Sequence, residues 1–285
     1  MNIINTISNI DDIFISGHFD LSEWKKYMDL YIPGAKEICL KDMIDCQRAG
    51  YTWEKDYLPI LDGAYNDLGK IDKVVNAFAE VTQNLNDRIY EVFNRTLDVD
   101  IYLYLGLCNG AGCVTEVSGK TTILLGIEKI IEFGWYDIDS MNALILHELG
   151  HVYQKQYGLF KITTNSEKDS FLWQLFTEGV AMVFEQEILG NFNYFHQDKD
   201  NWRNWCESNI ELIIRSFCDD LNTMTRDNQR YFGDWVSFEN HSDVGYYLGT
   251  RFVRFMLEEN SFDSIINYGL DKIKEEFDRF IGDKL

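Results

Sequence analysis

Residues 140–158 read SMNALILHELGHVYQKQYG and contain the motif H-E-x-x-H at His147, Glu148 and His151. Apolar residues recur at helical spacing on both sides of the motif, which predicts a helix that packs against a core. Residues four apart stack on one face of a helix, so the two imidazoles can bind one cation. Glu148 is displaced by about 100° around the axis, which places it beside that cation, where it can hold a metal-bound water.

Two histidines that can bind one cation, with a carboxylate beside that cation, form the constellation that a zinc hydrolase needs. The chain has only five histidines (His18, His147, His151, His196 and His241), so a chance match on a core-forming helix is unexpected. The alternative is a pair of partly buried histidines on an ordinary helix. The helical context favours the zinc interpretation, with Zn²⁺ as the cofactor.

Composition limits the architecture and the partners. A chain of 285 residues that is 46% hydrophobic can bury a large core, as one domain or as two closely packed ones. A net charge of −21 disfavours binding to nucleic acid or to an anionic membrane surface. The N-terminus lacks the features of a secretory signal, no stretch is long and apolar enough to span a membrane, and the six cysteines lack metal-site spacing. We therefore expect a cytoplasmic protein with reduced thiols.

The first third of the chain predicts helices. We expect them at residues 20–32, 35–49 and 70–95, with a loop at 51–67. Residues 1–98 would form an N-terminal helical region packed on the core. Nothing in this region indicates a particular chemistry.

From Val99 the pattern changes to that of strands. Residues 100–107, 113–117 and 121–127 are rich in β-forming residues, and residues 118–120 can form a hairpin turn. We expect a small antiparallel sheet before the H-E-x-x-H helix, with 113–117 or 121–127 as an edge strand able to hold an extended peptide. Overall the sequence predicts a mostly helical α+β protein.

A catalytic zinc needs a third protein ligand, and the helix expected at residues 169–189 offers candidates. Glu178 is distinguished from the others because it lies mid-helix among apolar residues, where a lone carboxylate is costly to bury unless it binds a metal or a partner. Gly179 and Ala181 beside it are small enough to let this helix pack close to the motif helix. The remaining candidates are Glu167, Asp169, Glu185 and Glu187.

H-E-L-G-H followed by T-E-G-V-A-M-V-F-E on the next helix resembles the gluzincin metallopeptidases, and most closely the N-E-G-F-A-x-x-x-E pattern of the zinc aminopeptidases. The resemblance implies a zincin-like catalytic domain at residues 99–285, or one continuous domain, with Glu178 as third zinc ligand. The interval from His151 to Glu178 is longer than in those enzymes, which indicates a divergent family. More broadly, the chain resembles bacterial families of predicted zinc-dependent proteases.

A second resemblance lies at S-D-V-G-Y-Y-L-G, residues 242–249, which is similar to the Y-x-x-G helix start of the same aminopeptidases. It implies that Tyr246 donates a hydrogen bond to the oxyanion, with Gly249 as a close-packing glycine. Tyr247 is the alternative donor, and His241 or Arg251 could share the role. A tyrosine packed in the core at a helix start is an equally good interpretation.

The chain also departs from these families. The aminopeptidase G-x-M-E-N motif is absent, so exopeptidase activity is not implied. Thermolysin-like enzymes orient a zinc-bound histidine with an Asp four residues after the ligand Glu, where this chain has Met182. Glu185 is the nearest substitute, since ligating histidines usually donate their other N–H to a carboxylate or carbonyl. We expect His196 to be a surface histidine.

These observations predict a zinc metallopeptidase that acts on peptide or protein substrates, with Glu148 as general base. Two alternatives remain. The same scaffold could hydrolyse another amide or an ester, or the chain could be a non-catalytic, metal-binding acidic protein that recruits a basic partner.

Overall fold

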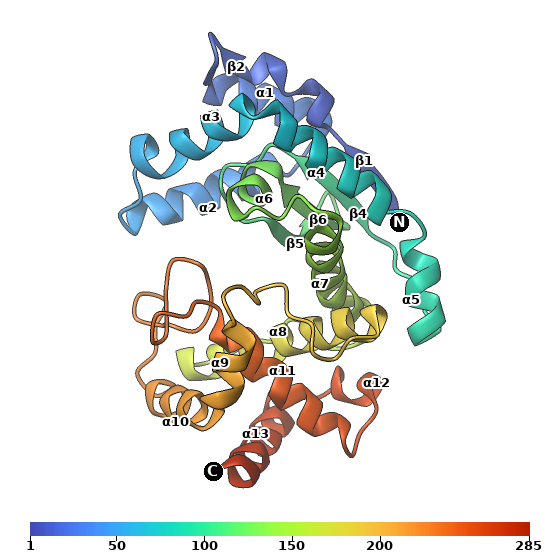
Figure 1. Cartoon of the computed structure of the whole chain (residues 1–285), viewed down its shortest axis with the longest axis vertical. Helices are drawn as coiled ribbons and strands as arrows, with labels where there is room; N and C mark the ends of the chain where they lie inside the picture. Colours follow the sequence, from blue (N-terminus) through green and yellow to red (C-terminus); the bar gives the residue numbers. More distant parts are fainter. The chain divides into compact units, whose positions relative to one another are not determined.

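The computed structural model describes residues 1–285 and is mostly helical, with a small mixed sheet, as expected for an α+β protein (Figure 1). Its residue contacts divide it into two compact units, Met1–Glu148 and Leu149–Leu285. This division falls within helix α7 (Ile138–Tyr157), whereas the sequence suggested a boundary after residue 98. None of the helices is both long and apolar enough to cross a bilayer.

The main sheet of the first unit has the strand order β1-β4-β6-β5. Its strands are β1 (Asn2–Asn5), β4 (Asp100–Tyr104), β5 (Gly112–Val117) and β6 (Lys120–Gly126). β4 runs parallel to both β1 and β6, and only β5 and β6 are antiparallel. The prediction of an antiparallel sheet was therefore wrong for β4, because strand direction depends on the crossover connection and not on the pattern within a strand.

The strand order shows which of the two predicted strands, 113–117 or 121–127, lies at an edge of the sheet. β6 is flanked by β4 and β5, and its middle residues are fully buried, whereas β5 is the terminal strand. The hairpin between them turns at Ser118 and Gly119, both at positive φ, as such a tight turn requires. Residues 113–117, and not 121–127, therefore form one edge of the sheet, and β1 forms the other.

Helices make up the rest of the first unit. They are α1 (Leu21–Tyr31), α2 (Lys36–Arg48), α3 (Leu58–Asn66), α4 (Leu68–Val81), α5 (Leu85–Phe93) and α6 (Ile127–Phe133), with a π-helical turn at Trp53–Tyr57 and a small strand pair, β2 (Phe14–Ile15) and β3 (His18–Phe19). α3 and α4 both contact α6.

Two predictions for these helices were wrong. Residues 51–67 are largely helical, because Pro59 occupies the first turn of α3, where its missing N–H costs nothing. The helix predicted at 70–95 is two helices, because Asn84 adopts a left-handed conformation that interrupts it.

The second unit is helical. After the end of α7 it contains α8 (Glu167–Leu189), α9 (Trp202–Ser208), α10 (Ile210–Asp220), α11 (Val244–Leu257), α12 (Phe262–Ile265) and α13 (Leu270–Lys284). α8 is its central element: fourteen of its residues are buried, and it contacts α11 extensively. Gly190, in the left-handed conformation, ends α8 as the sequence predicted.

Two close crossings fix α8 among its neighbours. A Cβ on Gly150 of α7 would lie 2.7 Å from Ala181 Cα, so this glycine and alanine bring α7 and α8 into backbone contact. A Cβ on Gly179 would lie 2.2 Å from the carbonyl oxygen of Gly249 on α11. Ala181 thus serves the close packing on α7 that was expected, whereas Gly179 serves the packing on α11.

Candidate metal centre

The H-E-x-x-H residues lie on α7 as the pattern predicts. His147, Glu148 and His151 are all buried, at 5%, 7% and 9% exposure. α7 is one continuous helix, so His147 and His151 lie one turn apart on the same face. Asp137 caps the start of this helix, because its Oδ1 accepts the backbone N–H of Ser140 at 2.9 Å.

Glu178 of α8 faces the histidines. Its Oε2 lies 3.3 Å from His151 Nε2, and one ligand atom from each of His147, His151 and Glu178 lies within 4.8 Å of the others. Two ligands held about 2.1 Å from a tetrahedral zinc lie roughly 3.4 Å apart, so the His151–Glu178 spacing matches that of two zinc ligands. The donor set of two imidazoles and one carboxylate also fits zinc.

The other acidic residues of α8 are engaged elsewhere. Asp169 forms an ion pair with Lys274, and Glu187 forms one with Arg254. Glu167 is exposed at the helix start. Of the five candidates that the sequence offered on or beside this helix, only Glu178 and Glu185 belong to groups that could hold a metal ion.

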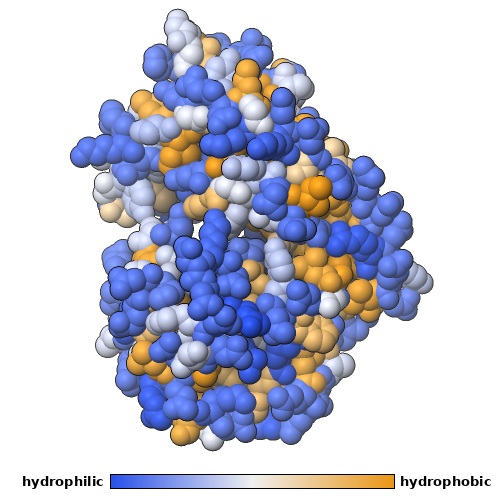
Figure 2. Space-filling view, in the orientation of Figure 1, coloured by the Kyte–Doolittle hydropathy of each residue, from blue (hydrophilic) through white to orange (hydrophobic).

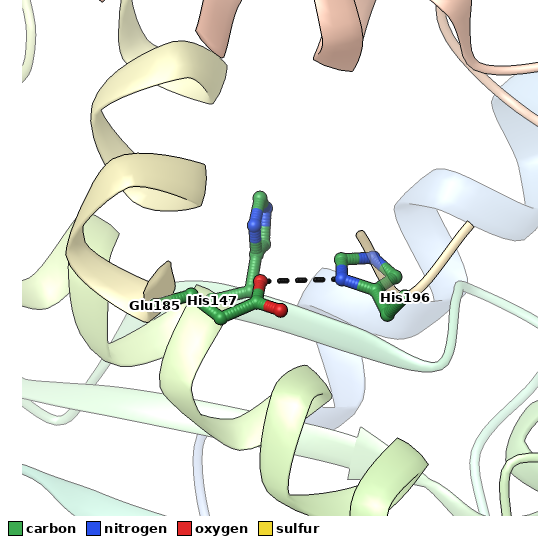
Figure 3. Close-up of side chains that lie close together, drawn as sticks. All are labelled: His147, Glu185 and His196. Carbon is green, nitrogen blue, oxygen red and sulfur yellow. Dashed lines mark hydrogen bonds and ion pairs between the residues drawn. The ribbon is translucent and has the colours of Figure 1, made fainter. Parts of the chain in front are cut away.

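Glu185 belongs to a second group, with His147 and His196, whose ligand atoms also lie within 4.8 Å of one another. Figure 3 shows the Glu185 carboxylate beside both rings, with its hydrogen bond to His196. The Glu185 side chain is fully buried, and this burial raises the pKa of its carboxyl group, while His196 opposes the shift. Its Glu185 and His196 side chains are 0% and 7% exposed, against 15% and 11% for Glu178 and His151, so the first group is the more accessible to water and substrate.

His196 corrects an expectation. It was expected at the surface, yet its side chain is only 7% exposed and its Nδ1 lies 3.2 Å from Glu185 Oε2. Sequence patterns carry little signal of this burial, because His196 lies in the irregular segment between α8 and α9, where no periodicity assigns a direction to a side chain.

Glu148 lies beside the edge strand in the first unit. A Cβ on Gly112, the first residue of β5, would lie 2.8 Å from Glu148 Oε1 and 2.9 Å from its Cγ. The glycine therefore leaves the space that the Glu148 side chain occupies, and the carboxylate lies against the start of the terminal strand.

The candidate oxyanion donors have different surroundings. Tyr246 is half-buried near the start of α11, with its ring edge-on to Phe232 at 6.0 Å, and it lies one turn before Gly249 at the crossing with α8. Tyr247 is buried against Phe195 and Trp202, and burial raises the pKa of its phenol to about 12.

The two further candidates for the oxyanion role are His241 and Arg251. His241 stacks on Trp205 at 3.8 Å, and Arg251 is exposed on α11. The six cysteines are all free, and none belongs to a group that could hold a metal ion.

Asp243 adds a buried acid to this region. It precedes α11, its Oδ1 accepts the backbone N–H of Gly233 at 2.9 Å, and burial raises the pKa of its carboxyl group to about 6. His196 lowers this pKa and Glu178 raises it, so Asp243 lies within electrostatic reach of both. Sequence reasoning did not single it out.

Searches of protein-family models, curated proteins and solved structures find no match to this chain.

Proposed function

We propose that this protein is a zinc-dependent metallopeptidase of the gluzincin type, with His147, His151 and Glu178 as zinc ligands. The observation that carries the proposal is the convergence of these three side chains, with His151 Nε2 and Glu178 Oε2 separated by the spacing of two ligands on one ion. His151 and Glu178 retain 11% and 15% side-chain exposure, which is consistent with a position open to water and substrate.

Zinc held by these ligands supplies Lewis-acid activation of a water molecule and of a substrate carbonyl. Glu148 would act as general base toward that water and then as general acid toward the leaving amine. Tyr246 is the proposed hydrogen-bond donor to the oxyanion, a contribution typically worth about 10² to 10³ in rate.

The position of Glu148 beside β5 supports a peptide substrate. β5 is the terminal strand, and an extended peptide can pair with such a strand through backbone hydrogen bonds. A scissile bond held there would lie close to Glu148, which contacts the first residue of the strand. A small hydrolase substrate would have no need of this strand, so the arrangement favours peptides over other amides or esters.

The proposal is tested by the matched change Glu148→Gln. We expect this variant to bind one zinc per chain like the wild type and to lose peptide hydrolysis by 10²-fold or more, since general-base catalysis contributes about 10² to 10⁴. Zinc is measured by elemental analysis, and turnover with a library of fluorogenic peptides.

Variants on α8 provide the control for metal binding. Glu178→Gln should lose zinc, whereas Glu167→Gln at the exposed start of the same helix should retain it. A wild type that binds zinc but cleaves no peptide or ester would favour the non-catalytic, metal-binding alternative. Hydrolysis of esters or small amides alone would favour the other hydrolase.

A further inference from the structure

A buried hydrogen-bonded chain leads from the segment after α8 to Glu185. His196 Nδ1 lies 3.2 Å from Glu185 Oε2, and Gln197 Nε2 lies 2.9 Å from His196 Nε2. His196 is 7% exposed and Glu185 is fully buried, so these contacts are shielded from solvent. Hydrogen bonds to a charged group in such surroundings are stronger than those in water.

The partners of His196 determine which of its nitrogens carries the proton. An amide NH₂ group can only donate, so Gln197 Nε2 donates to His196 Nε2, which must accept. With the Gln197 amide in this orientation, we infer that the proton resides on Nδ1, which donates to Glu185 Oε2. Gln197 Nε2 also lies 3.9 Å from Met182 Sδ, a weak acceptor, which supports this orientation of the amide.

From Glu185 this series of contacts continues toward His147, a proposed zinc ligand. Glu185 and His196 have ligand atoms within 4.8 Å of one on His147, and Figure 3 shows the Glu185 carboxylate beside the His147 ring. A histidine that binds zinc through one ring nitrogen donates the other N–H to a partner that fixes its orientation and raises its basicity. Glu185 can be that partner only if its carboxylate is held in place.

We propose that His196 is a positioning residue that holds the Glu185 carboxylate toward His147 and thereby strengthens metal binding. The inference rests on the proposed function in one respect, the assignment of His147 as a zinc ligand. His196 itself binds neither metal nor substrate. Its role is to donate a hydrogen bond, with its tautomer set by Gln197.

The test compares two variants of nearly equal shape. Asn places an amide N–H close to the position of His Nδ1, so His196→Asn keeps the donor, whereas His196→Leu fills a similar volume without one. We expect His196→Leu to weaken zinc binding about 10- to 100-fold and His196→Asn to remain within about threefold of wild type. The zinc dissociation constant is measured by competition with a chromophoric chelator.

Thermal melts of the metal-free proteins show whether both variants fold. A purely structural role for His196 would lower the melting temperature of the metal-free protein and leave the zinc affinity of the folded fraction unchanged. Equal zinc affinity of His196→Leu and wild type overturns the proposal. Equal weakening in both variants also overturns it, because the donor would then be irrelevant.

Nitrogen NMR of histidine-labelled wild type gives a measurement that requires no variant. The expected spectrum has the His196 proton on Nδ1 and Nε2 as an acceptor. A proton on Nε2 contradicts the proposed chain of hydrogen bonds. Neither the zinc affinity nor the NMR spectrum depends on turnover. The role of His196 is therefore still tested if the wild type binds zinc without hydrolysing peptides. A wild type that binds no zinc refutes the proposed function itself.

Discussion

Glu128 shows how a single buried carboxyl group shapes the loop before β5. It is 1% exposed, and it accepts the backbone N–H of Gly106 at 2.8 Å and that of Cys108 at 3.0 Å. A Cβ on Gly106 or on Gly126 would lie within 3.0 Å of its Oε1, so two glycines make room for it. Burial raises its pKa to about 6, and the backbone hydrogen bonds only partly oppose this shift.

Protonation of Glu128 should therefore affect stability. Its folded pKa of about 6 lies above the ordinary value of 4.5, so its stabilising contribution is complete below pH 4.5 and is lost as the pH rises through 6. A shift of this size amounts to about 2 kcal/mol in total, of which about 1 kcal/mol disappears between pH 5 and pH 7.5.

The matched variant Glu128→Gln isolates this contribution, because glutamine does not titrate. The stability advantage of the wild type over the variant, from urea unfolding, should be smaller at pH 7.5 than at pH 5 by about 1 kcal/mol. An advantage that grows with pH would show that the backbone hydrogen bonds outweigh desolvation.

A second prediction at the scale of single residues concerns Gly112, which lies against Glu148. Its substitution Gly112→Ala places a methyl group 2.8 Å from Glu148 Oε1, so the carboxylate must move. We expect turnover to fall by roughly 10-fold or more with zinc content unchanged, since misplacing a catalytic group by about 1 Å can cost 10²-fold. Gly63→Ala in α3, which meets open space, is the control and should have wild-type turnover. Unimpaired hydrolysis by Gly112→Ala would argue against a role for the Glu148 position.

At the scale of elements, the two crossings of α8 determine where Glu178 lies. Gly150 and Ala181 bring α8 against α7, and Gly179 and Gly249 bring it against α11. Because α8 is held on two sides, its rotation about its own axis is fixed, and Glu178 faces His151. Gly179 and Ala181 of the E-G-V-A stretch thus serve packing, and Glu178, which precedes them, faces His151.

Enlarging Gly179 should disturb this arrangement. Gly179→Ala puts a methyl group 2.2 Å from the backbone carbonyl of Gly249, and backbone cannot move aside cheaply. We expect a loss of about 1–3 kcal/mol in the free energy of unfolding, together with weaker zinc binding.

Gly282→Ala in α13 is the control for this change, because its Cβ meets open space. It should leave stability unchanged or raise it by up to about 1 kcal/mol, since alanine favours a helix more than glycine does. Urea unfolding measures both variants, and equal stabilities would mean that the helices can separate at the crossing without cost.

At the scale of the whole molecule, the composition is acidic and the visible surface is largely hydrophilic. The net charge is −21, and Figure 2 shows a face on which hydrophilic residues predominate and hydrophobic ones form small separate patches. The net charge is the ground on which the sequence predicts no nucleic-acid or anionic-membrane partner. It leaves the alternative of a basic partner to be tested by binding.

Metal binding should stabilise the whole molecule if it requires the folded site. At a free zinc concentration 100 times the dissociation constant, the stabilisation is about 2.7 kcal/mol, which corresponds to a rise of several degrees in melting temperature. A chelator should reverse the rise, and Glu178→Gln should abolish it. Calorimetry with magnesium in place of zinc provides the control, because a hard cation disfavours two imidazole ligands. An equal response to magnesium would indicate binding to the acidic surface.

The sequence by itself determined the motif helix, the three strands before it and the helix that carries Glu178, because each follows from local periodicity and from end signals such as Gly190. It also restricted the candidates for a third metal ligand to the carboxylates of one region. Only the tertiary structure decided that Glu178 faces His151, that β5 is the edge strand and that His196 reaches Glu185. These three facts depend on how distant segments cross and pair, which periodicity within a segment does not specify.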